Sequence, residues 1–181
     1  MTATRSTLGG RPALRIERRL TRPAERVWRA VTEPEELARW FVAPVPWTPV
    51  AGEEFEAGGE RGRITAFEPP RLIAWSWGIE RYSFELTPDG DGCLLVFMHA
   101  YDPALGPGHQ HAAGWEAYFD RLDAHVAGGY LSEEDAHAGM QARIDRYRAA
   151  LGPEPEPEPG AGADVPRASA SPTSPSGSWS Q

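Results

Sequence analysis

The spacing of large apolar residues over positions 114–126 predicts an α-helix with one strongly aromatic face. These residues recur at intervals of three and four, which places them along one side of a helix. They are Trp115, Tyr118, Phe119, Leu122 and Val126. Because three of the five carry aromatic rings, the face needs a broad apolar surface as its partner. We expect this helix to pack on a sheet formed by the preceding residues.

Alternating apolar and polar positions predict a series of strands before this helix. The first strand covers residues 14–21, and Arg18 is the one charged residue on its apolar side. The later strands are expected at residues 54–57, 60–67, 71–77, 81–87 and 93–101. Short turns join them, and the Asp-Gly-Asp-Gly turn at 89–92 is typical of a hairpin. The sheet should therefore be antiparallel, with one face solvated and the other covered by the helix.

Two short helices are expected between the first and second strands, and another helix near the end of the folded region. Pro23 and Pro34 each stand in a first helical turn, where proline is tolerated. Ser132 is a typical N-cap for the last helix. We therefore expect three parts in the chain. These are a flexible N-terminus over 1–12, one folded domain over 13–151, and a disordered tail rich in Pro, Glu and Ser over 152–181.

Composition narrows the classes of function. The net charge is −8 and the sequence shows no basic stripe, so nucleic-acid binding is not expected. All 18 basic residues are arginine, which excludes a lysine nucleophile, and the single Cys93 excludes an intramolecular disulfide. No apolar run is long enough to span a membrane and no secretory signal is visible, so we expect a cytoplasmic protein. The sequence gives no indication of oligomeric state.

Three segments carry a family resemblance. They are residues 23–32 with 37–41, residues 86–92 with the strand ending at His99, and residues 113–116 with Leu122. In this order they resemble bacterial relatives of the activator of the 90-kDa heat-shock chaperone ATPase. That group belongs to the START-like, or SRPBCC, superfamily, and the likeness covers about residues 14–150.

The resemblance implies an α+β helix-grip fold. In this fold a curved antiparallel sheet of about six strands wraps around a long C-terminal helix, and two short helices follow the first strand. Many members have a cavity between sheet and helix. Members bind hydrophobic ligands, act as cyclases or dock on the chaperone, so the fold alone does not fix the function.

Bulky rings on facing elements predict a ligand cavity between the sheet and the long helix. The candidate lining residues are Trp40, Trp75, Trp77, Tyr82, Phe84, Phe97, His99, Trp115 and Phe119. These aromatic residues either line the cavity or simply fill the core. His99 either contacts a ligand, as a hydrogen-bonding group or an acid–base group, or is a satisfied core histidine.

Polar candidates for the same space are Arg18, Asp102 and Glu116. Arg18 either meets a carboxylate or a ligand anion, or reaches the open end of the sheet and snorkels to water, which we favour. His109 and His111 with Glu116 are weighed as metal ligands, but residues two apart on a helix do not share a face. We therefore predict no metal site and, in the absence of a nucleotide-binding motif, no cofactor.

Three functions follow as hypotheses. The first is a non-enzymatic domain that binds a small hydrophobic or amphipathic molecule. The second is a chaperone-associated protein that stimulates the chaperone ATPase by docking on it. The third is an enzyme of cyclase or hydrolase type that works in the cavity through His99 or Glu116. No catalytic residue is assigned, and the first hypothesis is favoured.

Overall fold

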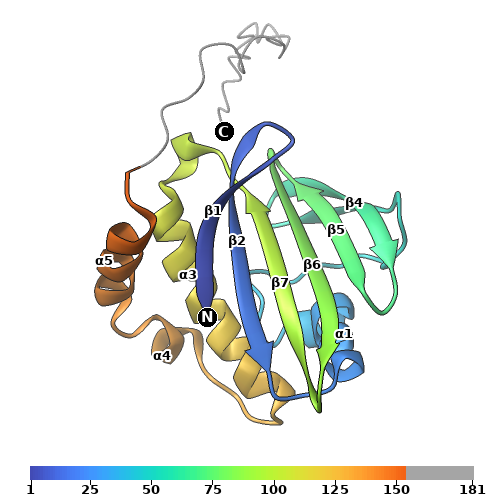
Figure 1. Ribbon diagram of the computed structural model, residues 1–181. Helices are drawn as coiled ribbons and strands as arrows, with labels where there is room; N and C mark the ends of the chain where they lie inside the picture. The colour runs from blue at the N-terminus through green and yellow to red at the C-terminus, as the bar shows by residue number, and fades with distance from the viewer. Residues whose placement is uncertain (154–181) are drawn as a thin grey trace, which may run out of the picture.

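A computed structural model describes residues 1–153, which form a seven-stranded antiparallel sheet and the helices packed on it (Figure 1). The strand order is β1-β2-β7-β6-β5-β4-β3. The strands are β1 (Thr2–Leu8), β2 (Arg11–Leu20), β3 (Glu54–Ala57), β4 (Glu60–Glu68), β5 (Leu72–Trp77), β6 (Glu80–Asp89) and β7 (Gly92–Ala100). The helices are α1 (Ala24–Thr32), α2 (Pro34–Leu37), the 3-10 turn η1 (Pro103–Leu105), α3 (Gly108–Val126), α4 (Glu133–His137) and α5 (Met140–Leu151). This is the α+β helix-grip fold that the resemblance implies.

The N-terminal residues form a strand, so the prediction of a flexible segment over 1–12 is wrong. β1 pairs with β2 in antiparallel register from Thr2–Glu17 to Leu8–Arg11, and it raises the strand number from about six to seven. Arg5 on β1 also donates hydrogen bonds at 2.9 Å to the carbonyls of Leu151 and Gly152, at the end of α5. These contacts hold the segment at the edge of the sheet. The tail predicted over 152–181 lies, beyond residue 153, outside the described residues.

α3 covers the concave face of the sheet, as the aromatic spacing predicts. Its buried residues Trp115, Phe119, Leu122 and Val126 face the inner sides of β2, β6 and β7. Figure 1 shows α3 behind the sheet, on the same side as α1, with α5 on the outer side of α3. None of the helices described between residues 1 and 153 has the length and apolarity needed to cross a membrane.

The last predicted helix is divided in two. Ser132 caps α4 by accepting a hydrogen bond from the backbone N–H of Asp135, as expected. Gly139 then takes a left-handed conformation with φ 71° and separates α4 from α5. The break turns α5 back along α3, where Tyr147 is buried.

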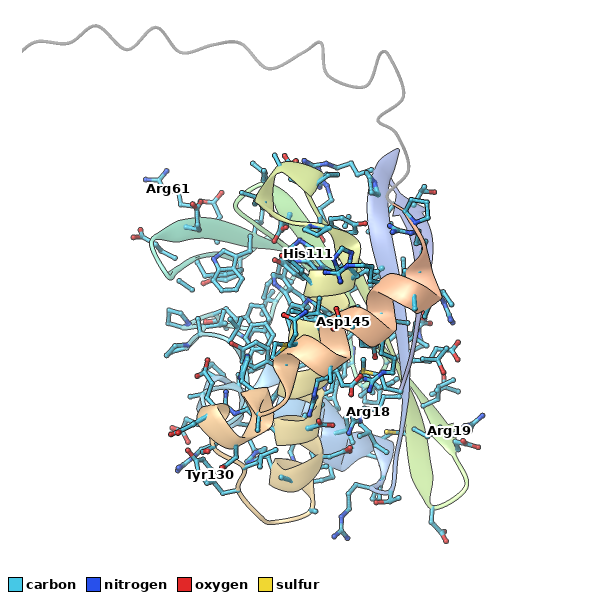
Figure 2. The ribbon with its side chains drawn as sticks, turned by 90° about the vertical axis from the view of Figure 1, so that its left-hand side faces the viewer. Arg18, Arg19, Arg61, His111, Tyr130 and Asp145 are labelled. Carbon is cyan, nitrogen blue, oxygen red and sulfur yellow. The ribbon has the colours of Figure 1, made fainter. Side chains whose placement is uncertain are left out.

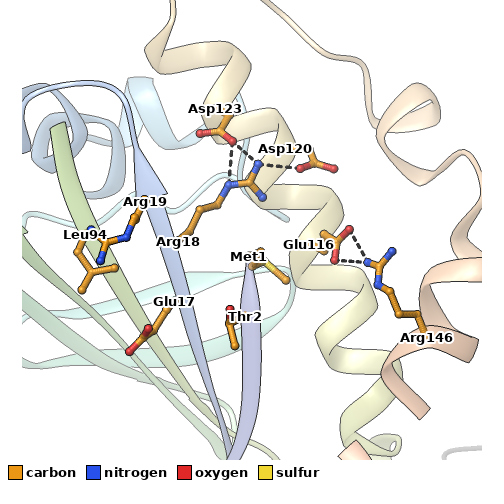
Figure 3. Close-up of a pocket in the computed structure, with 10 residues that line it drawn as sticks. All are labelled: Met1, Thr2, Glu17, Arg18, Arg19, Leu94, Glu116, Asp120, Asp123 and Arg146. Atoms are coloured by element: carbon orange, nitrogen blue, oxygen red, sulfur yellow. Dashed lines mark hydrogen bonds and ion pairs between the residues drawn. The ribbon is translucent and has the colours of Figure 1, made fainter. Parts of the chain in front are cut away.

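Arg18 on β2 forms an ion pair with two carboxylates of α3. Its Nε donates to Asp123 at 2.8 Å and its terminal nitrogen donates to Asp120 at 2.8 Å (Figure 3). Burial alone would lower the pKa of this guanidinium, but the two aspartates more than offset that effect and raise it. The favoured prediction that Arg18 snorkels to solvent is therefore wrong. The residue fixes the middle of α3 to the edge of the sheet.

Substituting Arg18 should destabilise the fold, and the neighbouring Arg19 offers a matched control. The Arg18 side chain is 14% exposed, whereas Arg19, paired with Asp89, is 72% exposed. Arg18→Ala should lower the free energy of unfolding by about 1–3 kcal/mol, because it leaves the partly buried carboxylate of Asp123 without its donor and Asp120 with Arg143 alone. Arg19→Ala should change it by about 0.5 kcal/mol or less. Urea denaturation measures both, and equal losses would contradict this role of Arg18.

Candidate functional site

The centre of the space beneath α3 is filled by aromatic rings. Phe84 and Phe97 lie 4.9 Å apart between ring centroids, Phe97 and Phe119 lie 5.4 Å apart, and Trp40 stacks on Phe119 at 6.3 Å. These four residues and Trp75 are almost completely buried. Five of the nine predicted lining residues are therefore packed against one another in the core: Trp40, Trp75, Phe84, Phe97 and Phe119.

The other four predicted lining residues border an open groove at one end of α3. The groove consists of two adjoining hollows of about 340 and 250 Å³, which share Trp77, Glu80 and Tyr82. The first hollow adds Glu60, Gly78, Ile79 and Leu105. The second adds Val42, His99, Gln110, His111, Gly114, Trp115 and Tyr118. Figure 2 shows His111 on α3 at some distance from Tyr130, which follows the other end of that helix. We call these two hollows together the groove.

His99 on β7 is held at the inner wall of the groove by contacts from β6 and α3. It lies directly opposite Tyr82 in the β6–β7 register, and the two rings stack at a centroid distance of 4.6 Å. The indole N–H of Trp115 on α3 donates to Nδ1 of His99 at 3.0 Å. Since Nδ1 accepts this bond, the proton of the neutral imidazole lies on Nε2. Nε2 is 3.2 Å from Oε2 of Glu80, an ion-pair distance, and this buried nitrogen forms no hydrogen bond with the described residues.

Glu80 is an ionised carboxylate at the junction of the two hollows. Its Oε2 also accepts a hydrogen bond from the hydroxyl of Tyr82 at 2.5 Å. Burial would raise the pKa of Glu80, but the contacts from His99 and Tyr82 outweigh burial and lower it to about 2. Burial and the same carboxylate raise the pKa of Tyr82, so the phenol remains a donor. The second oxygen, Oε1, is buried and accepts no hydrogen bond from the described residues.

This geometry favours binding over proton transfer. Nδ1 of His99 accepts the hydrogen bond from Trp115, and Nε2 is buried 3.2 Å from Oε2 of Glu80. A general base needs a nitrogen that can reach the reacting proton, and His99 offers none toward the groove. The hydroxyl of Tyr82 is likewise turned to Glu80. The groove presents aromatic walls and one carboxylate oxygen with a free acceptor position.

The remaining polar candidates lie away from the groove. Asp102 accepts a hydrogen bond from the backbone N–H of Ala104 and caps η1. Glu116 is bound by Arg146 and Tyr147 of α5. The region 1–153 contains no group of three or more His, Cys, Asp or Glu side chains that could hold a metal ion.

A charged hollow of about 600 Å³ lies between β1, β2 and the middle of α3 (Figure 3). Its walls include Arg18 with Asp120 and Asp123, and Glu116 with Arg146. Each of these charges pairs with an opposite charge on a neighbouring element. The ion pairs therefore connect α3 with β2 and with α5. None of these five side chains offers an unpaired charge to a ligand.

Glu80 is the charged residue at the junction of the two hollows, and the sequence prediction missed it. The predicted strand begins at residue 81, whereas β6 begins at Glu80, paired with Trp77 of β5. Residues two apart on a strand share a face, so Glu80 lies on the same side as Tyr82. The alternation through Tyr82, Phe84 and Leu86 would have located it if the strand had been extended by one residue.

Fold and site together define a START-like helix-grip domain with an open groove. The sequence model of the family described as "Activator of Hsp90 ATPase homolog 1-like protein" matches residues 21–127. That match covers more than half of the chain, and the protein belongs to this family. No curated protein matches the chain in a sequence search.

Solved structures confirm the fold. The crystal structure of CalU16 from Micromonospora echinospora has a TM-score of 0.67 and 27% identity, covering 82% of this chain and 94% of that one. EF2215 of Enterococcus faecalis, a conserved protein of unknown function, has a TM-score of 0.67 and 20% identity over 82% of this chain and 90% of its own. BPP1335 of Bordetella parapertussis has a TM-score of 0.60 and 24% identity, over 77% of this chain and 86% of its own.

The lowered pKa of Glu80 predicts a defined pH dependence of stability. A carboxylate whose pKa falls from 4.5 in the unfolded chain to about 2 in the folded one stabilises the fold above pH 4.5. This contribution is lost as the pH falls from 4.5 toward 2. Glu80→Gln removes it, so the difference in free energy of unfolding between wild type and variant should shrink over that range. Urea denaturation at several pH values measures this difference, and a constant difference would contradict the assignment.

Proposed function

We propose that this protein is a non-enzymatic binding module that holds a small amphipathic molecule in the groove. The observation that carries the proposal is the combination of an exposed apolar border with convergent polar groups at the base. Ile79 is 53% exposed and Leu105 is 65% exposed, and both line the same hollow as Trp77. Small-molecule sites are mostly apolar and aromatic with a few placed polar groups.

The dimensions of the groove support the same proposal. Its two hollows, of about 340 and 250 Å³, adjoin at Tyr82. Ligand pockets commonly occupy roughly 300–1,000 Å³. The apolar border suits the body of an amphipathic molecule, and His99 and Glu80 at the base suit its polar end. The aromatic core beneath α3 is packed ring on ring, which favours the groove over the centre of the grip as the binding place.

Docking on the 90-kDa heat-shock chaperone is the second candidate, and the family to which the chain belongs is the observation that favours it. The groove itself adds no argument for a protein partner. Catalysis in the groove finds little support, because Nδ1 of His99 is bound to Trp115 and Nε2 is buried beside Glu80. If a variant of this protein with a blocked groove still recovers the chaperone in a pull-down, the result would favour the second candidate.

Gly114 offers a way to block the groove without disturbing the core. It lies on α3 at the groove, and a Cβ built on it meets no atom within 4 Å. Gly114→Leu should therefore fold normally and weaken binding of a neutral amphipathic probe, 4-phenylbutan-1-ol, by about tenfold or more. Ala127→Leu, at an exposed position just beyond the other end of α3, is the matched control and should bind as wild type does.

Isothermal titration calorimetry measures these affinities, and circular dichroism checks the fold of each variant. Absence of probe binding to the wild type would contradict the proposal. Equal affinity of wild type and Gly114→Leu would contradict it as well, because the probe would then bind elsewhere.

A further inference from the structure

The lining of the groove carries negative charge without a matching arginine. Glu60 and Glu80 both line the hollow that contains Ile79 and Leu105, and none of the arginines within residues 1–153 lines either hollow. Elsewhere the described carboxylates commonly meet an arginine, as Asp120 meets Arg18. A groove with this charge attracts cations and repels anions.

Glu80 has one oxygen that the protein leaves unsatisfied. Oε2 takes the contacts from Tyr82 and His99, whereas Oε1 is buried and accepts no hydrogen bond from the described residues. A buried acceptor without a donor destabilises the protein, and the effect is larger when the acceptor is charged. A ligand that brings a donor to this oxygen removes the penalty. A ligand that brings a positively charged donor also gains from the ion pair.

Two basic side chains lie close to the groove, and neither supplies this donor. Arg11 donates to the backbone carbonyl of Ile79, and it is absent from the lining. His111 packs edge-on against His99 at a ring-centroid distance of 5.0 Å and also contacts Tyr101. The charge of His111 acts on ionised Glu80 from a distance, but no described side chain donates a hydrogen bond to Oε1, so this acceptor is left to a group from outside the chain.

Aromatic rings surround the same carboxylate. Tyr82 contacts both Trp77 and Trp115, at ring-centroid distances of 6.4 and 6.0 Å, and all three rings line the groove. Aromatic faces attract ammonium groups, most strongly where water is excluded. One positively charged group in the groove can therefore pair with the carboxylate and contact the faces of these rings at the same time.

We propose that the ligand of the groove is an amphipathic amine, whose ammonium group donates to Oε1 of Glu80 among the three rings and whose apolar body lies along Ile79 and Leu105. This inference rests on the proposed function and adds the chemical class of the ligand. A carboxylate ligand of the same shape would meet Glu60 and Glu80 in the groove and be repelled.

The test compares three probes that differ only in the polar end: 4-phenylbutylamine, 4-phenylbutan-1-ol and 4-phenylbutanoate. At pH 7 the amine should bind the wild-type protein about tenfold more tightly than the alcohol, and the carboxylate more weakly than either. In Glu80→Gln the preference for the amine should fall to about twofold or less. Glu85→Gln is the control, since this carboxylate stands on the same strand, is paired with Arg71, and is outside the groove lining.

The outcomes separate this inference from the proposed function. If the alcohol binds as tightly as the amine and Gly114→Leu weakens both, the amine assignment is overturned while the binding groove stands. If no probe binds, both are overturned. The comparison of amine with alcohol in the wild-type protein needs no variant, so it decides the question even if Glu80→Gln fails to fold.

Discussion

The hydrogen bond from the indole of Trp115 to Nδ1 of His99 is the contact on which the site depends. It joins α3 to β7 at 3.0 Å and fixes which nitrogen of the imidazole carries the proton. Nε2 lies 3.2 Å from Oε2 of Glu80, and the hydroxyl of Tyr82 donates to the same carboxylate oxygen. Oε1 of Glu80 accepts no hydrogen bond from the described residues. The contact between Trp115 and His99 thus holds the imidazole at the wall against which the ionised carboxylate lies.

Packing determines where a ligand can be held. The sheet and α3 meet through rings such as Phe84, Phe97 and Phe119, which contact one another and occupy the centre of the grip. Large buried rings contribute strongly to stability, so opening this core would be costly. The free space lies instead at the end of the grip, where β5 and β6 meet the beginning of α3. The aromatic residues of the core and those of the proposed binding groove are thus two different groups.

Periodicity and short turns predicted the antiparallel sheet and the long helix on it well, because they report directly on helices and antiparallel strands, and the resemblance implied the helix-grip fold. The prediction failed for residues whose environment depends on partners far away in the sequence. Alternation showed that Arg18 was unusual, but only the structure places Asp120 and Asp123 beside it. The segment containing β1 has a polar composition, and it is ordered by pairing with β2 and by Arg5 at the end of α5. Likewise, alternation locates the aromatic residues, but only the packed structure divides them into core and groove.

The indole N–H signals of the tryptophans test the position of the binding site directly. Trp77 and Trp115 line the groove, whereas Trp40 and Trp47 are buried in the core and outside the groove lining. In ¹H–¹⁵N spectra recorded during titration with 4-phenylbutylamine, the signals of Trp77 and Trp115 should shift while those of Trp40 and Trp47 stay in place. Shifts confined to Trp40 and Trp47 would show that the ligand enters the core and would contradict this account.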